Sequence, residues 1–380
     1  MSQEIEYNPF IIKGYFDKLH FCDRDHETNK LFSNLVNQTN TTIFSPRKLG
    51  KTGLIYHIFE TCKSELNCKV LYIDLYATQN ITDFTSLLAK EVFLNIPKTK
   101  SLTKKFLDSI KALRPTLSFD PLTGNPEMSL NMVSDQIPNE NIENLFQYLD
   151  SLGIPVYIAF DEFQQIVHYP ETNTEALLRT ILQKLKNCVF IFAGSHATIM
   201  NEMFNSAKRP FYSSTSSLSL GKIPTDAYRT FIQQLFKSRG RTISLDAIDF
   251  ILTWTTGYTY PVQYVCHEIF ATGKRNIDIT FSKLVAAQIL QEQAHIFLQY
   301  RNLITAPQWQ LLKALAKEES TKQPFNKDFL IKYRLGAASS TKRSLDSLIE
   351  KELILAESTP NGMEYSVYDK LFLRYLQRLP

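Results

Sequence analysis

The chain has 380 residues, of which 44% are hydrophobic and 21% are charged. This balance is typical of a globular protein and excludes intrinsic disorder and collagen-like structure, and the length is enough for two or three domains. The net charge of +4 and the pI near 8.6 neither demand nor exclude a polyanionic partner. Whether the chain has a basic surface for such a partner depends on where its charged residues lie.

The first 20 residues predict an N-terminal extension without the marks of a secretory signal. Acidic residues stand where a basic n-region would be, and no long apolar segment follows. The most apolar runs, at 156–160 and 189–193, are far shorter than the ~20 residues of a membrane helix. The five cysteines are scattered, and no Cys/His set has zinc spacing. We therefore expect a cytoplasmic protein with reduced cysteines and no membrane segment.

Residues 21–224 alternate short apolar runs with longer segments of helical period, and this pattern is typical of parallel strands joined by crossover helices. The strand-like runs are 41–45, 69–76, 154–160 and 189–194. Residues 52–62 follow the first run with helical spacing. The sequence therefore predicts an α/β core, a parallel sheet with helices on both faces, and an inserted β-hairpin at 116–132 around a Thr-Gly-Asn-Pro turn.

After Pro224 the strand pattern gives way to helical periods, which predict a helical lid subdomain over 225–304. From 305 to 380 the order is three short helical stretches followed by two strand-like runs around Pro360-Asn361-Gly362, which predicts a winged helix. The third of these helices is expected to begin within 338–341, where Ala-Ser-Ser-Thr has the signature of an N-cap. Lys342 and Arg343 are expected to lie on its exposed face.

The segment Ser45-Pro46-Arg47-Lys48-Leu49-Gly50-Lys51-Thr52 follows the first strand and opens a helix, as a phosphate-binding loop does. Backbone N–H groups of such a loop meet the phosphates at the helix N-terminus. Lys51 is expected to reach the β- and γ-phosphates, Thr52 to bind Mg²⁺, and Gly50 and Gly53 to let the backbone approach closely. Ser45 replaces the first glycine of the pattern, which is compatible with the fold if Ser45 stays extended before Pro46. An incidental strand-turn-helix is the alternative.

The run 154–160 ends in Asp161 and Glu162, and two carboxylates after a buried strand favour a catalytic edge of the sheet. We expect Asp161 to hold Mg²⁺ and Glu162 to orient or deprotonate the attacking water. Ser195 follows the next strand and is a candidate sensor of the γ-phosphate. Helix capping is the alternative for both Asp161 and Ser195.

These motifs resemble the archaeal-type ATPases of the STAND class, an AAA-related P-loop family that includes similar bacterial proteins of Bacteroidetes. The paired Arg47 and Lys48 belong to the resemblance, as does the segment 21–27, Phe-Cys-Asp-Arg-Asp-His-Glu, a degenerate form of a family element that lies by the adenine and ribose. The resemblance implies nucleotide contacts for Phe21 and Arg24. It implies the same for Pro261 in the lid, where extra residues separate it from Gly257, and a proline that starts a helix is the alternative. For Arg209, just beyond the third strand-end, the resemblance implies a charge-stabilising role, and a solvated basic loop is the alternative.

The resemblance implies a nucleotide-controlled switch that binds ATP or ADP with Mg²⁺, hydrolyses ATP slowly, and rearranges its lid and winged helix. A DNA-binding regulator or loader of the transposition or repair type and a nucleotide-bound scaffold remain as alternatives. We expect a protein partner, an oligomer that depends on nucleotide, and at most weak duplex-DNA binding through Lys342 and Arg343. Residues 301–380 hold 13 Lys and Arg against nine Asp and Glu, an excess of four that matches the net charge of the whole chain.

Overall fold

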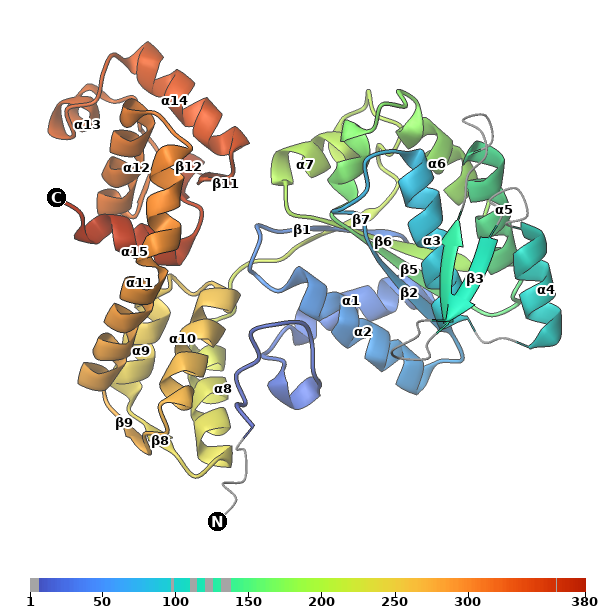
Figure 1. Cartoon of the computed structure of the whole chain (residues 1–380), viewed down its shortest axis with the longest axis horizontal. Coiled ribbons are helices and arrows are strands. Elements are labelled where there is room, and N and C mark those ends of the chain that lie inside the picture. Colours follow the sequence, from blue (N-terminus) through green and yellow to red (C-terminus); the bar gives the residue numbers. More distant parts are fainter. Residues whose placement is uncertain (1–6, 97–98, 110–114, 120–125, 131–137, 360) are drawn as a thin grey trace. The chain divides into compact units, whose positions relative to one another are not determined.

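The computed structural model describes residues 7–96, 99–109, 115–119, 126–130, 138–359 and 361–380 (Figure 1). The chain divides into two compact units, which we describe separately. The core unit is Arg24–Gly221. The helical unit combines the N-terminal residues up to Asp23 with Lys222–Pro380.

The core unit is built on a sheet of five parallel strands in the order β2-β5-β6-β1-β7. The strands are β1 (Thr41–Phe44), β2 (Lys69–Asp74), β5 (Val156–Asp161), β6 (Cys188–Gly194) and β7 (Ser216–Ser219). Every residue of β5 and β6 is buried, because helices cover both faces of the sheet. Since the strands are parallel, the loops that follow β1, β5 and β6 meet at one edge.

Helices α1 and α2 lie on one face of this sheet, and the helices that follow β2, β5 and β6 lie on the other (Figure 1). This division follows from right-handed crossovers, since the chain moves from β1 across to β2 and then back strand by strand. The helices of the core unit are α1 (Asp25–Val36), α2 (Lys51–Glu65), α3 (Ile81–Asn95), α4 (Lys100–Ser109), α5 (Pro138–Asp150), the 3₁₀ helix η3 (Phe163–His168), α6 (Thr174–Leu182) and α7 (Ala197–Asn205).

The four strands expected from apolar runs are present, with ends that differ by one or two residues. The fifth strand, β7, was not predicted, because its sequence Ser-Ser-Leu-Ser contains only one apolar residue, Leu218. An edge strand pairs through its backbone on one side only, so it needs no apolar run. The segment expected as a hairpin contains the antiparallel pair β3 (Pro115–Phe119) and β4 (Pro126–Leu130). Its turn lies outside the described residues.

The helical unit begins with four helices and a two-residue strand pair: α8 (Thr225–Ser238), β8 (Thr242–Ile243), α9 (Leu245–Trp254), α10 (Thr259–Ala271), β9 (Asn276–Ile277) and α11 (Ile279–Asn302). Residues of the N-terminal segment belong to this unit. Phe10 is 1% exposed, and its ring lies 4.8 Å from that of Phe236, while Asn8 donates a hydrogen bond to the carbonyl of His267. The N-terminal segment is therefore part of the packing of these helices.

The helical unit continues into a winged-helix domain: α12 (Ala306–Glu318), β10 (Ser320–Thr321), α13 (Lys327–Lys332), α14 (Ala338–Glu350), β11 (Ile354–Thr359), β12 (Gly362–Val367) and α15 (Lys370–Arg378). Its strands form an antiparallel sheet in the order β10-β12-β11. The helix expected near 338–341 starts there, but the predicted N-cap is wrong: the cap residue is Ala337, and no side chain caps α14. The hydroxyl residues lie inside the first turn of the helix. Only a side chain at the cap position can accept hydrogen bonds from the free amides of that turn.

Helices α8 to α11 and the winged-helix domain share one hydrophobic core, which runs from α8 to α15. Arg374 of α15 joins them most directly. It is 8% exposed, and its guanidinium donates to the carbonyls of Thr253 at 3.0 Å and Trp254 at 2.6 Å at the end of α9. The same guanidinium pairs with Glu319 at the end of α12. Separating these helices would leave the buried Arg374 guanidinium without some of its acceptors, which costs free energy. We therefore infer that helices α8 to α11 and the winged helix move as one body.

Lys370, at the start of α15, makes the stability of this unit depend on pH. It is 4% exposed and donates to Ser366 Oγ and the Val367 carbonyl, at 3.0 and 2.9 Å. Burial lowers the pKa of its ammonium to about 8, although the Glu357 carboxylate acts in the opposite direction. The unfolded chain keeps this proton up to pH ~10.4. Between those two values the unfolded state binds more protons, so the stability contribution of Lys370 rises with pH.

We therefore expect the free energy of unfolding of the wild-type chain to rise relative to that of Lys370→Met by about 1–2 kcal/mol between pH 8 and pH 9.5. Urea unfolding followed by tryptophan fluorescence measures this, since both tryptophans, Trp254 and Trp309, lie in the helical unit. The difference between the two proteins cancels the titration of other groups. Parallel pH profiles would contradict the assignment of the shift to Lys370.

Candidate functional site

The loop between β1 and α2 has the backbone conformation that the sequence motif requires. Lys48 and Gly50 adopt left-handed φ values of 68° and 100°, and Gly50 is the N-cap of α2. Ser45 is not among the residues with positive φ, so the position that usually holds glycine is filled without strain. The loop ends on Lys51, which is the first residue of α2. N–H groups at the start of this helix therefore lie at the carboxyl edge of the sheet.

Lys51 is buried, with 6% of its surface exposed, and its Nζ donates to the Ser45 carbonyl at 3.1 Å. The ammonium thus folds back across the loop it belongs to. Pro46 and Arg47 are half-buried, Lys48 is exposed and Leu49 is buried at 3%. Gly53 follows in the first turn of α2. The residues expected in the phosphate loop therefore form one continuous turn.

Arg24 braces this loop from the start of α1. It is 5% exposed, and its guanidinium donates to the Leu49 carbonyl at 3.4 Å and to the Gly221 carbonyl at 2.6 Å. Glu27 accepts a third bond at 2.9 Å. Arg24 itself has a φ of 74°, a left-handed conformation that is held by these contacts. Phe21, the other residue of this element, belongs to the helical unit, where its ring lies 5.8 Å from that of Tyr15.

Asp161 and Thr52 come together at the edge of the sheet. Thr52 Oγ1 donates to Asp161 Oδ2 at 2.7 Å, and Tyr72 Oη donates to the same oxygen at 2.8 Å. Burial raises the pKa of the Tyr72 phenol, and the Asp161 carboxylate adds to that effect. Asp161 is the last residue of β5 and is 3% exposed. The capping alternative for Asp161 does not hold, because no side chain caps η3.

Glu162 is held in place by two donors. Its Oε2 accepts from Ser195 Oγ at 2.6 Å and from Gln164 Nε2 at 2.5 Å. Burial pushes the pKa of Glu162 up, but the bonds from Ser195 and Gln164 and the positive charges of Lys51 and Arg47 outweigh it, so the pKa lies below its usual value. Its backbone has a φ of 52°, which is uncommon for a residue with a side chain and concentrates at functional sites.

Ser195 connects this carboxylate to the phosphate loop. Its hydroxyl donates to Glu162 and accepts from Arg47 Nε at 3.2 Å. The capping alternative for Ser195 does not hold either, because the N-cap of α7 is His196 and no side chain caps that helix. Arg47 also lies over the ring of Tyr76, 5.8 Å from its centre. A chain of contacts therefore joins the ends of β6 and β5 to the loop after β1.

The structure gives the other expected site residues separate surroundings within their own units. Arg209 forms ion pairs with Glu175 and Glu202, so its guanidinium is engaged on α6 and α7. Pro261 is a buried residue in the first turn of α10 in the helical unit. Lys342 and Arg343 are exposed on α14, as expected from the helical period.

Two residues of the site, Tyr72 and Gln164, were not expected from the sequence. Tyr72 lies within β2, whose register pairs it with Ala159 and so places its hydroxyl near the end of β5. That neighbour becomes visible only once the strand order is known. Gln164 carries a weak local signal, since it is a buried polar residue two positions after Glu162. The second oxygen of its amide, Oε1, has no hydrogen-bond partner in the described part of the chain.

A parallel sheet, a loop before α2 that carries Lys51 and Thr52, and two carboxylates at the end of β5 define a P-loop ATPase fold. In comparisons with known families, residues 21–265 match an ATPase domain predominantly from Archaea, and the chain belongs to that family. Residues 295–378 match a probable winged helix domain. The α/β core with its C-terminal winged helix, expected from the sequence, is confirmed.

An uncharacterized ATP-binding protein of Methanocaldococcus jannaschii is 29% identical over 167 residues, which are 40% of this chain and 44% of the relative. This chain therefore matches less than half the length of that relative. Among solved structures, a Walker-type ATPase of Pyrococcus abyssi has a TM-score of 0.66 at 16% identity and covers 97% of this chain and 99% of its own.

The ORC2 protein of Aeropyrum pernix, solved as ADPNP-ADP complexes, has a TM-score of 0.60 at 13% identity, with 98% and 97% covered. The ORC1 protein of the same organism, solved in complex with DNA, has a TM-score of 0.51 at 12% identity, with 94% and 92% covered. At such identities these structures show the fold alone. In the described ranges, no helix is both long and apolar enough to cross a membrane.

Proposed function

We propose that this protein is a nucleotide-controlled switch of the STAND type, with an AAA-like core that binds ATP with Mg²⁺ and hydrolyses it slowly. The observation that carries the proposal is the pair of contacts at the sheet edge: Thr52 to Asp161 at 2.7 Å and Ser195 to Glu162 at 2.6 Å. In this proposal the first pair would hold the metal ion, and the second would hold the attacking water.

Binding of the triphosphate would use the amides of residues 47–52 and the ammonium of Lys51. The Lys51 ammonium now donates to a loop carbonyl, and phosphate oxygens would replace that acceptor with charged ones. Arg24 would keep the Leu49 carbonyl turned away from the phosphates, since its guanidinium holds that oxygen. In this proposal Arg24 positions the loop, while Phe21 and Pro261 contact the base.

Hard oxygen donors suit Mg²⁺, and the Thr52 hydroxyl and the Asp161 carboxylate are such donors. Within the ranges that the structure describes, no three His, Cys, Asp or Glu side chains gather to hold a metal. That suits an ion that keeps waters and phosphate oxygens as its other ligands. When bound, it would neutralise charge on the phosphates. Tyr72, which donates to Asp161 Oδ2, would hold the carboxylate in its present orientation.

Glu162 would orient the water that attacks the γ-phosphate. Its pKa lies below the usual value, so the carboxylate is charged at neutral pH and accepts a hydrogen bond from that water. Ser195 would sense the γ-phosphate, because its hydroxyl already lies between Arg47 and Glu162. Arg209 would contribute only if it left its pairs with Glu175 and Glu202.

The switch itself would move the lid and the winged helix together, since Arg374 joins α9, α12 and α15. We expect hydrogen exchange of residues 225–380 to differ between the ADP state and the state with a non-hydrolysable ATP analogue. Within that range the amides around Thr253 and Trp254 are expected to stay equally protected in both states, because Arg374 holds the carbonyls of both residues. Identical exchange in both states would favour a static nucleotide-bound scaffold instead.

A DNA-binding regulator is the second candidate, favoured by the exposure of Lys342 and Arg343 on α14. We expect at most weak duplex binding that falls steeply with salt, because each phosphate contact releases counterions. Reversing both charges, with Lys342→Glu and Arg343→Glu, should lower affinity and flatten the salt slope by about one unit per lost contact. Fluorescence anisotropy with a duplex at several salt concentrations measures both. The matched control is Lys317→Glu with Lys327→Glu, and an equal loss there would show a nonspecific charge effect.

Two further properties are part of the proposal. We place the protein in the cytoplasm, supported by five cysteines that are all free and buried. We also expect a protein partner and an oligomer that depends on nucleotide. The winged-helix domain is the surface we assign to partner contacts if duplex DNA does not bind.

A further inference from the structure

Strand β2 is an edge of the core sheet, and one side of its backbone has no neighbouring strand. Of the described strands, only β5 pairs with β2. The amides of Lys69 and Leu75 donate to carbonyls at the two ends of β5, at 2.9 and 3.0 Å. Residues of a strand face its two sides alternately, so the amides and carbonyls of Val70, Tyr72 and Asp74 point away from β5.

A groove of about 280 Å³ lies at this unpaired edge. Val70, Tyr72 and Asp74 line it from β2, and helices α2 and α3, which lie on opposite faces of the sheet, line its two sides (Figure 1). The lining residues of α2 are Tyr56, Phe59 and Lys63, and those of α3 are Leu87, Glu91 and Asn95. Two helical turns on each side and five residues of β2 each span about 12 Å, the length of four or five extended residues.

Two carboxylates of the groove have no cationic partner. Asp74 accepts from a backbone amide and Glu91 from the Asn95 side chain, each at 3.0 Å, and neither forms an ion pair with a described residue. Burial raises the pKa of both carboxyls, although these hydrogen bonds act in the opposite direction. Lys63, which also lines the groove, pairs with Glu60 instead. A cation from outside the chain would therefore complement the charge of this groove.

Two aromatic rings lie beside these carboxylates. The rings of Tyr56 and Tyr72 both line the groove, and their centres are 4.7 Å apart. The Tyr72 hydroxyl already donates to Asp161, so its ring is the part that remains for a ligand. Burial raises the pKa of the Tyr56 phenol, and the Glu91 carboxylate adds to that effect. Neutral tyrosine rings attract ammonium and guanidinium groups, which are the cations that proteins carry.

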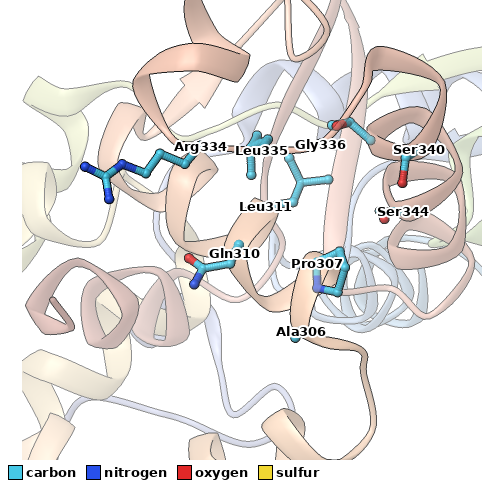
Figure 2. A pocket seen from close by; sticks show the side chains of 10 residues that line it. Ala306, Pro307, Gln310, Leu311, Arg334, Leu335, Gly336, Ser340 and Ser344 are labelled. Carbon is cyan, nitrogen blue, oxygen red and sulfur yellow. The ribbon is translucent and has the colours of Figure 1, made fainter.

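A second hollow, of about 310 Å³ in the winged-helix domain, lacks these features. Figure 2 shows Leu335, Leu311 and Pro307 in the middle of its lining, with Ser344 toward one end and Arg334 at the other. Arg334 is the one charged residue among its described lining residues, and none of them belongs to a strand. That hollow would repel a cation and offers no backbone edge, so the two features occur together at β2.

We propose that the edge of β2 binds an extended segment of a partner protein that carries two basic side chains. The backbone of the segment pairs with the outward amides and carbonyls of β2 and adds a strand to the sheet. Asp74 lies on the α2 face of the sheet with Tyr72, and Glu91 lies on the α3 face. Successive side chains of a strand point to opposite faces, so the two basic residues are adjacent in the partner's sequence. The proposal goes beyond the nucleotide switch, because it gives the core unit a partner surface of its own.

The test uses the nucleotide-free chain and the peptide acetyl-Thr-Val-Arg-Arg-Val-Thr-amide, with isothermal titration calorimetry. We expect saturable binding with one site per chain. Asp74→Asn and Glu91→Gln keep the shapes of the side chains and should each weaken binding about fivefold, because each removes one partly exposed ion pair. Glu65→Gln is the matched control, since Glu65 is an exposed carboxylate of α2 outside the groove. Its affinity for the peptide should equal that of the wild type.

Two altered peptides separate strand pairing from charge. The peptide N-methylated at its four central amides keeps both arginines but cannot donate from these amides, and it should bind at least about tenfold more weakly. The peptide with glutamines in place of the arginines keeps its amides but loses both charges, and it should also bind at least about tenfold more weakly. Circular dichroism of each protein variant checks that it is folded.

Absence of binding by the arginine peptide would overturn the proposal, as would equal affinity of either altered peptide. Weakening by Glu65→Gln equal to that by Glu91→Gln would show a general charge effect and would also overturn it. Ser344→Phe narrows the winged-helix hollow and should leave the affinity unchanged, so a loss there would move the peptide to that hollow. A nucleotide-free dimer that binds no peptide would assign the edge of β2 to a second copy of the chain. ATP affinity is measured separately, so failure here and failure of the switch are distinguishable.

Discussion

Replacing Lys51 by alanine should weaken ATP binding by at least about 10²-fold while the chain stays folded. Lys51 is 6% exposed, and its ammonium donates to a loop carbonyl, an acceptor that charged phosphate oxygens would replace. Losing a charge-assisted contact to phosphate removes about 1.5–3 kcal/mol per hydrogen bond, and one lysine makes more than one. Without nucleotide, removing a buried cation should change the stability by no more than about 1 kcal/mol.

Lys63→Ala is the matched control for this change. Lys63 lies on the same helix, α2, but is exposed and pairs with Glu60 on the surface. Its loss should alter neither ATP affinity nor stability by more than a few tenths of a kcal/mol. ATP affinity is measured by equilibrium titration, and folding by circular dichroism and thermal unfolding. Wild-type affinity in a folded Lys51→Ala protein would contradict the assignment of 45–52 as a phosphate loop.

The second large effect is expected for Glu162→Gln, which removes the charge but keeps the shape. Turnover of ATP should fall about 10²- to 10³-fold, because the amide is a poor acceptor for the attacking water. ATP affinity should remain close to wild type, since the hydrogen bonds to the Glu162 carboxylate come from Ser195 and Gln164, while Lys51 and Arg47 of the loop act on it through their charges. A fall in kcat with an unchanged affinity is the signature of a group that acts in the transition state.

Glu143→Gln serves as the control, because Glu143 is an exposed carboxylate of α5 that pairs with Lys184. Its turnover should equal that of the wild type. Phosphate release under single-turnover conditions measures the chemical step directly. If Glu162→Gln hydrolyses ATP at the wild-type rate, another group orients the water, and Glu162 has a structural role in the loop after β5.

Much of the core was predictable from local signals. The runs that form β1, β2, β5 and β6 are apolar because helices cover both faces of a parallel sheet. Such strands can therefore be predicted from their hydrophobic residues. The roles of Gly50 and Lys51 could be predicted because a phosphate-binding loop needs a residue with left-handed backbone and a cation at a fixed spacing. The Asp161-Glu162 pair stood out for a similar reason: two carboxylates end a strand that is otherwise apolar.

Other parts of the fold lacked such signals. β7 contains a single apolar residue and forms because β1 offers it a free edge. The cap at 338–341 was misplaced because the hydroxyl residues that suggest a cap are used inside the first turn of α14. Local propensity marks where a helix begins to within a few residues, but the position of the cap depends on how the helix packs.

Residues that are adjacent in the chain therefore sufficed to predict the fold class and to locate the loop before α2 and the two carboxylates that end β5. Which side chains meet across the sheet depends on how the strands pack. Tyr72 reaches Asp161 only through the pairing of β2 with β5, and Ser195 reaches Glu162 and Arg47 only because β6 lies between β5 and β1. Strand order is a property of the whole packed unit, set by long-range burial, so no window of the sequence contains it.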